Sequence, residues 1–119
     1  MASNTASING LMFNTGPAEY YTDAFRQVLE DHMALLRASK TTQGVNVSSQ
    51  DAWAFNEDFY AYVAQRLNLP PHLHWVTMRL NNMTSRNQFG QHEKALLIPN
   101  ANLLEQIRSA YLTSATITH

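Results

Sequence analysis

Hydrophobic residues recur at helical spacing in four stretches of the chain, and these stretches predict four helices. The first helix should begin after Thr22, whose hydroxyl can cap it, and end near Ser39. The second should end before Pro70, and the third should begin at Pro70 and Pro71, because a helix tolerates proline in its first turn. The predicted apolar positions are Phe25, Val28, Leu29, Met33 and Leu36, then Phe59, Tyr60, Val63 and Leu67, then Leu73, Val76, Leu80 and Met83, and finally Leu103, Leu104, Ile107, Tyr111 and Leu112.

The fourth helix follows a proline-ended apolar run near the end of the chain. Asn100 or Asn102 can cap this helix, and we expect the Thr-rich end beyond it to be loose. The run Ala95–Ile98 before Pro99 is a candidate for a short buried strand. The sequence therefore predicts a strand followed directly by a helix in this region.

A second strand is predicted from alternation of side chains. The pattern Ala-Trp-Ala-Phe over residues 52–55 places Trp53 and Phe55 on one face of a short strand, and residues 56–58 then supply a turn with acidic residues that suit a helix start. Val45 and Val47 also alternate, and the connector that holds them permits a short strand as well.

Two pairs of residues mark the ends of the third helix. Trp75 has a large apolar body and one N–H donor, which suits a wedge between helices and sheet with a bond to a backbone carbonyl. His74 can orient a turn in the same way. Asn81 and Asn82 can adopt left-handed backbone geometry, so we interpret them as the C-terminal cap of this helix.

The chain has 119 residues, a formal net charge of −1 and no cysteine. This length fits one domain, which we assign to residues 22–119 with a core at about 52–98, preceded by an irregular leader over residues 1–21. The balanced charge makes neither nucleic acid nor a membrane surface an expected partner. We find no targeting signal and no transmembrane segment, so we expect a soluble protein made in a cytoplasm.

Charged residues make up only 14% of the chain, compared with roughly 25% in an average soluble domain. Uncharged polar groups are less costly to desolvate than ions, so such a surface suits burial against neighbouring proteins. The alternative is a monomer whose surface binds no other protein. If the protein assembles, we expect contacts from aromatic and apolar residues of the leader and the last helix, namely Phe13, Tyr20, Tyr21, Leu104 and Tyr111.

Chemical sites find little support in the sequence. His72 and His74 would point about 200° apart on a helix, which keeps both from binding one metal ion, and His92 lies further along the chain. The carboxylates of Glu57 and Asp58 suit a helix start better than a catalytic pair, and no nucleophile motif or phosphate-binding glycine loop accompanies them. We therefore expect no enzyme activity, no metal and no cofactor.

The order of these features resembles the LysM-like baseplate wedge subunit family of contractile-tailed bacteriophages. The resemblance is carried by the strand at 52–55, the turn at 56–58, Val63-Ala64 in the following helix, His74-Trp75, and Asn81-Asn82. It implies an α+β fold that is predominantly helical, with a small LysM-like β-α-α-β core between flanking N-terminal and C-terminal helices. The turn lacks the Gly-Asp-Thr sequence of that family, and Leu69-Pro70-Pro71 replaces its Tyr-Gly.

This resemblance implies a structural virion protein of a phage tail or baseplate that is not an enzyme. Its partners would be other tail or baseplate proteins, in multiple copies within a symmetric assembly, and it would be located in the virion after synthesis in the host cytoplasm. Two alternatives remain open at this point. One is a LysM module that binds peptidoglycan, and the other is a head-tail connector or neck protein.

Overall fold

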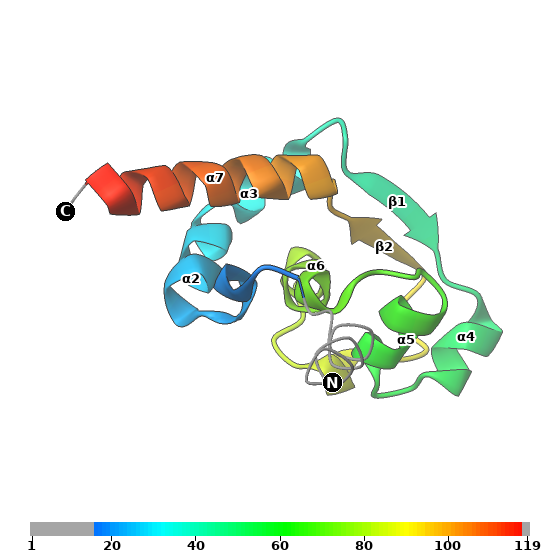
Figure 1. Ribbon diagram of the computed structural model, residues 1–119. Coiled ribbons are helices and arrows are strands. Elements are labelled where there is room, and N and C mark those ends of the chain that lie inside the picture. The colour runs from blue at the N-terminus through cyan, green and yellow to red at the C-terminus, as the bar shows by residue number, and fades with distance from the viewer. Residues whose placement is uncertain (1–15, 118–119) are drawn as a thin grey trace, which may run out of the picture.

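The computed structural model describes residues 16–117, with side chains described as far as Ser114. The fold is α+β and mainly helical, with helices flanking a small sheet at both ends, as the sequence predicts (Figure 1). In chain order the elements are η1 (Ala18–Tyr21), α2 (Asp23–Asp31), α3 (Met33–Ala38), β1 (Gln43–Asn46), α4 (Ser49–Ala54), α5 (Phe59–Gln65), η2 (Pro71–Leu73), α6 (His74–Leu80), η3 (Arg86–Gln88), β2 (Ala95–Ile98) and α7 (Ala101–Ile117).

The first predicted helix is confirmed, but it is divided at His32 into α2 and α3. The hydroxyl of Thr22 caps it by accepting the Phe25 N–H at 3.3 Å, and Ser39 ends it. At the division, Nδ1 of His32 lies 2.7 Å from the Val28 carbonyl oxygen, to which it donates. This side-chain bond lies at the end of α2, where the His32 ring competes with the backbone for the Val28 carbonyl.

The predicted strand at residues 52–55 is wrong, because this segment belongs to the short helix α4. Ser48 begins α4 by accepting the Asp51 N–H at 3.0 Å, and Trp53 is 71% exposed. The first strand is instead β1, in the connector whose alternating valines permit it. β1 and β2 are antiparallel, with Gln43 opposite Ile98. Three α-helices, α4, α5 and α6, lie between the two strands in chain order, whereas a β-α-α-β order would have two.

The turn and helix that follow α4 agree with the sequence prediction. Asp58 caps α5 by accepting the Ala61 N–H at 3.3 Å. Glu57 adopts a positive φ of 60° and donates its N–H to the Phe89 carbonyl at 2.7 Å. α5 ends before Pro70, and the turn of η2 begins at Pro71 and leads directly into α6.

Two hydrophobic clusters form the core, and α6 lies between them (Figure 1). The terminal cluster joins α6 to the helices at both ends of the chain, and its buried members are Tyr20, Phe25, Leu29, Met33, Leu36, Leu73, Val76, Leu80, Leu104 and Ile107. The central cluster joins α6 to the sheet, α4 and α5, and its buried members are Val47, Ala52, Phe59, Tyr62, Val63, Met78, Met83, Phe89 and Leu96. The predicted stripe of α6 is thus divided, because Met83 packs in the central cluster.

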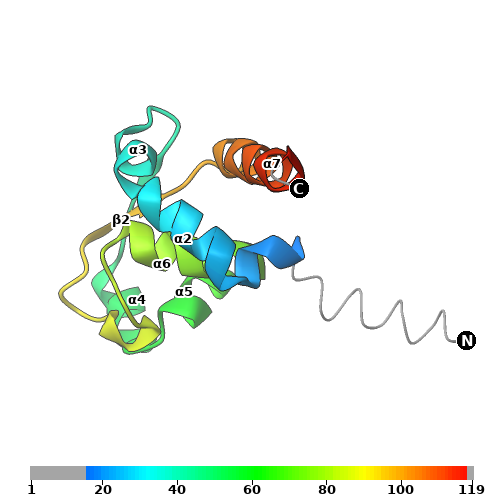
Figure 2. The same ribbon diagram turned by 90° about the vertical axis from the view of Figure 1, so that its left-hand side faces the viewer.

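The last helix, α7, is longer than the sequence suggests. Asn100 begins it by accepting the Leu103 N–H at 3.0 Å, as expected, but the helix continues to Ile117, so the prediction of a loose end is wrong for that stretch. Neither glycine nor proline interrupts residues 101–117, which permits this length. Figure 1 shows α7 reaching outward beyond α2, and Figure 2 views it nearly end-on beside α2 and α3.

Candidate protein-binding groove

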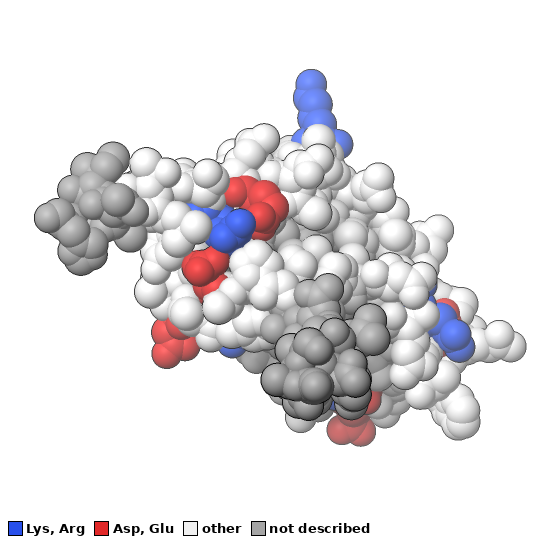
Figure 3. All heavy atoms as spheres, in the orientation of Figure 1, with Lys and Arg blue, Asp and Glu red and all other residues white. Residues whose placement is uncertain are grey.

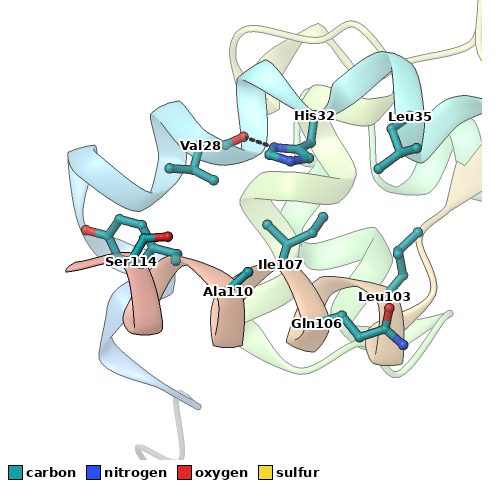
Figure 4. Close-up of a pocket in the computed structure, with 9 residues that line it drawn as sticks. Val28, His32, Leu35, Leu103, Gln106, Ile107, Ala110 and Ser114 are labelled. Carbon is teal, nitrogen blue, oxygen red and sulfur yellow. Dashed lines mark hydrogen bonds between the residues drawn. The ribbon is translucent and has the colours of Figure 1, made fainter. Parts of the chain in front are cut away.

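An apolar groove of about 470 Å³ lies between the N-terminal helices and α7. Figure 4 shows side chains from α2 and α3 along one wall and side chains from α7 along the other. Leu35 projects at one end with 54% of its surface exposed, and Ala110 leaves an open position in the opposite wall. The lining residues are Val28, His32, Leu35, Leu103, Gln106, Ile107, Ala110, Tyr111 and Ser114.

The groove follows from how α7 is fixed to the terminal cluster. The rings of Tyr111 and Phe25 lie 5.1 Å apart, and Leu104 is fully buried, so one face of α7 is held against α2. The neighbouring face carries Leu103, Ile107 and Ala110, which line the groove, and no further helix within residues 16–117 covers the groove on that face.

None of the lining residues is an aspartate, glutamate, lysine or arginine. The charges of α7 lie on another face, where Arg108 pairs with Glu105 and with Glu19, each at 2.9 Å. Figure 3 shows charged side chains in a few small groups with uncharged surface between them. A groove of this chemistry suits an uncharged, apolar segment of a protein.

The ion pairs of Arg108 with Glu19 and Glu105 lie beside η1, and the buried Tyr20 joins them. The Tyr20 hydroxyl donates to Glu105 at 2.6 Å, and its pKa is raised, first by burial and then by that bond. The hydrogen bond from Arg108 is the largest cause that lowers the pKa of Glu105. This network holds η1 to α7 on the side of the helix away from Gln106 and Ala110.

The residues predicted as a structural signature lie at the two ends of α6. Nε2 of His74 lies 2.9 Å from the Leu69 carbonyl oxygen, so the ring orients the turn before α6. Trp75 packs against both clusters, as expected of a wedge. Its expected bond to a carbonyl is not among the hydrogen bonds of the described residues, and the guanidinium of Arg26 lies over its ring at 4.9 Å.

Asn81 and Asn82 cap α6, as the sequence predicts. Asn82 has a φ of 66°, and its N–H donates to the Arg79 carbonyl, while the Met83 N–H donates to the Met78 carbonyl at 3.1 Å. These two bonds form a Schellman motif, and the side chains of Met78 and Met83 are both buried in the central cluster.

The Asn81 side chain has a second role that the sequence does not reveal. Its amide donates to the carbonyls of Thr77 at 2.8 Å and Leu97 at 2.9 Å, and its oxygen accepts the Leu97 N–H at 2.7 Å. Asn81 thus pairs with both backbone groups of one residue of β2, which fixes the end of α6 to the sheet.

The five predicted partner contacts fall into different environments. Phe13 lies outside the described residues. Tyr20 and Leu104 are buried in the chain's own terminal cluster, so the structure does not present them to a partner. Tyr21 is 42% exposed, and Tyr111 lines the groove. Sequence reasoning missed Leu35 and Ala110, because the groove depends on which faces of distant helices meet.

The structure does not bring the histidines together. His74 contacts the Leu69 carbonyl, His92 lies 3.1 Å from Glu93, and His72 packs its ring against Tyr20 at a centroid distance of 4.7 Å. Among the described residues, no three histidine, aspartate or glutamate side chains are placed to hold a metal ion. No described helix is both long and apolar enough to cross a membrane.

A second hollow, of about 540 Å³, lies beside the exposed Trp53. Its other lining residues are small or neutral and polar, namely Ser49, Gln50, Ala54 and Gln91. It combines an aromatic face with amide and hydroxyl groups. No local sequence signal indicates this hollow, because residue 91 is distant in the chain from α4.

No known family model, curated protein or solved structure matches this chain.

Proposed function

We propose that this protein is a structural, non-enzymatic component of a bacteriophage tail or baseplate, which assembles by packing against neighbouring virion proteins. The observation that carries the proposal is the apolar groove between α2, α3 and α7, whose lining contains no aspartate, glutamate, lysine or arginine. An apolar groove bordered by helices is a common docking site for a helix of a partner. In this role the protein would be synthesised in the host cytoplasm and located in the virion.

The small proportion of charged residues supports a role in assembly. Charged residues make up 14% of the chain, and the long-range ion pairs Glu30–Arg79 and Glu19–Arg108 lie within the chain itself, where they join α2 to α6 and η1 to α7. The cores of protein interfaces are similarly depleted of charge. The more specific assignment to a phage baseplate rests on the resemblance in the order of the turn, the His-Trp pair and the Asn-Asn cap.

The proposal is tested by co-expressing the full chain with the tail and baseplate proteins encoded beside its gene. We expect one of them to form a stable complex, measured by light scattering after size exclusion. Leu35→Glu should weaken this complex at least tenfold, because it places a charge in the groove. Trp53→Glu is the matched control, since it adds the same charge at an exposed residue distant from the groove. No complex, together with absence of the protein from virions by mass spectrometry, would contradict the proposal.

A glycan-binding function is a second candidate, and the hollow beside Trp53 favours it. An exposed aromatic ring can contact the apolar face of a sugar, and the amides of Gln50 and Gln91 can bond to its hydroxyls. The test is sedimentation with purified peptidoglycan. Binding that Trp53→Ala removes and Leu35→Glu leaves unchanged would favour this function over assembly through the groove.

A further inference from the structure

The two edges of the small sheet differ in how their backbone groups are satisfied. On β2, the Leu97 N–H donates to the side-chain oxygen of Asn81 at 2.7 Å, and the Leu97 carbonyl accepts from the Asn81 amide at 2.9 Å. Both backbone groups of Leu97 therefore point away from β1. A side chain of α6 thus closes the outer edge of β2 to a further strand.

The outer edge of β1 is open. Gly44 stands opposite Leu97, so its N–H and carbonyl point away from β2, as those of Leu97 point away from β1. The same holds for Asn46, because the next residue, Val47, donates inward to the Lys94 carbonyl at 2.9 Å. No other described element bonds to these four outward groups, which we call the β1 edge, and Figure 1 shows no further element beyond β1 on that side.

The usual devices that protect an edge strand are absent from β1. Natural proteins place lysine, proline or a bulge at such an edge to prevent pairing with another chain. Residues 41–50 contain no charged residue and no proline, and the pairing of β1 with β2 runs without a bulge. Neither a positive φ nor a close neighbour among the described residues requires the glycine at position 44. A glycine inside a strand is typical of a place where another backbone approaches.

We propose that β1 pairs with β1 of a second copy of this chain, antiparallel about a two-fold axis at Val45, so that the two sheets join into one sheet of four strands. The pairing does not involve the groove and goes beyond the proposed function. In this register Gly44 of one copy stands opposite Asn46 of the second, and such a pair exchanges two backbone hydrogen bonds. Because the axis produces this pair twice, every group of the β1 edge is satisfied on both copies.

The side chains of β1 complement those of a second β1. Opposite residues of an antiparallel pair share a face, so Asn46 of the second copy lies beside Gly44, where the missing side chain leaves room. On the other face the two Val45 side chains meet at the axis, beside the central cluster against which Val45 packs. No like charges face each other, since residues 41–50 are uncharged. The joined sheet also has the three or more strands that a stable sheet needs.

The first test is the oligomeric state of the full chain, measured by sedimentation equilibrium from about 10 μM to about 1 mM. We expect a monomer-dimer equilibrium whose dissociation constant rises at least tenfold in Asn46→Pro, because proline removes one outward N–H from each copy and so two of the four bonds. Asn46→Ala is the matched control, since it keeps the N–H, and should leave the constant unchanged. Circular dichroism melting checks that both variants are folded. A chain that is monomeric over the whole range, or a dimer that Asn46→Pro leaves unchanged, overturns the proposal.

Amide hydrogen exchange tests the pairing without a substitution. The amides of Gly44 and Asn46 should exchange at least tenfold more slowly at high than at low protein concentration, because they bond only in the dimer. The amide of Thr84, which bonds to the Gln88 side chain on the exposed surface, is the reference and should not change. A dimer in which the amides of Gly44 and Asn46 exchange as fast as in the monomer overturns β1 as the contact.

A crosslink tests the position of the axis. The chain has no cysteine, so Val45→Cys introduces a single thiol. At the axis the two Cα atoms of residue 45 lie about 4.5 Å apart, a separation that a disulfide can bridge. In Asn46→Cys the two thiols are diagonal neighbours, with Cα atoms about 7–8 Å apart, beyond that range. We expect mild oxidation to link Val45→Cys and not Asn46→Cys, and equal crosslinking of the two variants contradicts this register.

Failure of this inference can be distinguished from failure of the proposed function. Leu35→Glu, which alters the groove, should leave the β1 dimer unchanged. A monomeric chain that binds a baseplate protein through Leu35 overturns the pairing and leaves the assembly function standing. Protection of the Gly44 and Asn46 amides only when a tail protein is added overturns the second copy as the partner of β1. A β1 dimer that binds no tail protein and is absent from virions supports the pairing and contradicts the virion assignment.

Discussion

The two hydrophobic clusters meet on α6, but different forces join them to that helix. At the terminal cluster, Arg79 of α6 forms an ion pair with Glu30 of α2, and the Arg37 guanidinium donates to the Leu80 carbonyl at 3.0 Å. At the central cluster, the neutral amide of Asn81 bonds to the backbone of Leu97. The charged contacts at α6 therefore hold the N-terminal helices in place, whereas a neutral side chain fixes α6 to the sheet.

The largest effects should come from removing one buried ring in each cluster. Phe25 and Phe59 are fully buried, so Phe25→Ala and Phe59→Ala should each lower the free energy of unfolding by about 3–5 kcal/mol. Because both clusters share α6, we expect a single transition for each variant in urea, with the same midpoint by tryptophan fluorescence and circular dichroism. Two separate transitions for Phe25→Ala would mean that the terminal helices unfold independently of the sheet.

The difference between the clusters also explains what could be predicted from the sequence. The cap at Thr22, the cap at Asn81 and Asn82, and the helix start after residues 56–58 depend on neighbouring residues, and the sequence predicted them correctly. For the last helix the sequence left Asn100 or Asn102 as the cap, and the structure has Asn100. These signals are local, because a cap satisfies backbone groups within one turn.

Two features were not predicted, for different reasons. The alternation of residues 52–55 indicated a strand, but the cap from Ser48 to the Asp51 N–H begins a helix there, and this S-x-x-D signal was present in the sequence. The groove had no local signal at all. It arises where Leu35 and Ala110, which lie far apart in the chain, line one space after packing.

A smaller effect is expected at the junction of α6 with the sheet. Asn81→Ala removes three hydrogen bonds and leaves the N–H and carbonyl of Leu97 without these partners, which should cost about 2–3 kcal/mol. Hydrogen exchange at the Leu97 amide should become faster. Asn82→Gly is the matched control, because glycine adopts the φ of 66° without strain, and its stability should stay within about 1 kcal/mol of the original. Equal losses in both variants would show that the cap, not the bond to β2, is what matters.

The ion pair on the other side of α6 should contribute less and should respond to salt. The side chains of Glu30 and Arg79 are 28% and 24% exposed, so Glu30→Gln should cost only about 0.5–1 kcal/mol. This cost should shrink at about 1 M NaCl, where exposed charges are screened, while the cost of Asn81→Ala should stay constant. Urea unfolding of both variants at low and high salt measures these two costs. If salt changes both costs equally, the junction of α6 with α2 is not more electrostatic than its junction with the sheet.

The smallest effect concerns pH, and it should arise at the terminal cluster. Nδ1 of His72 is buried without a hydrogen-bond partner among the described residues, and its ring packs against Tyr20. Burial is the largest cause that lowers the pKa of His72 below 6.5, with Glu105 acting in the opposite direction and His74 and Arg108 adding to the decrease. The folded protein therefore binds this proton less well than the unfolded chain does, so stability should be unaffected well above pH 6.5 and should decrease as the pH falls below it.

A second loss should begin at lower pH, because Glu105 has a pKa below 4.5 in the fold, owing first to its bond from Arg108. Its contribution is present above pH 4.5 and is lost as the pH falls through the folded pKa, which separates it from the His72 effect. Urea unfolding between pH 7.5 and 5, in steps of about half a unit, measures the first loss alone. His72→Phe keeps an aromatic ring beside Tyr20 but cannot titrate, so it should flatten the profile in that range. If the free energy of unfolding of His72→Phe depends on pH as strongly as that of the original protein, another group titrates. The pH dependence would then not distinguish the terminal cluster from the central cluster.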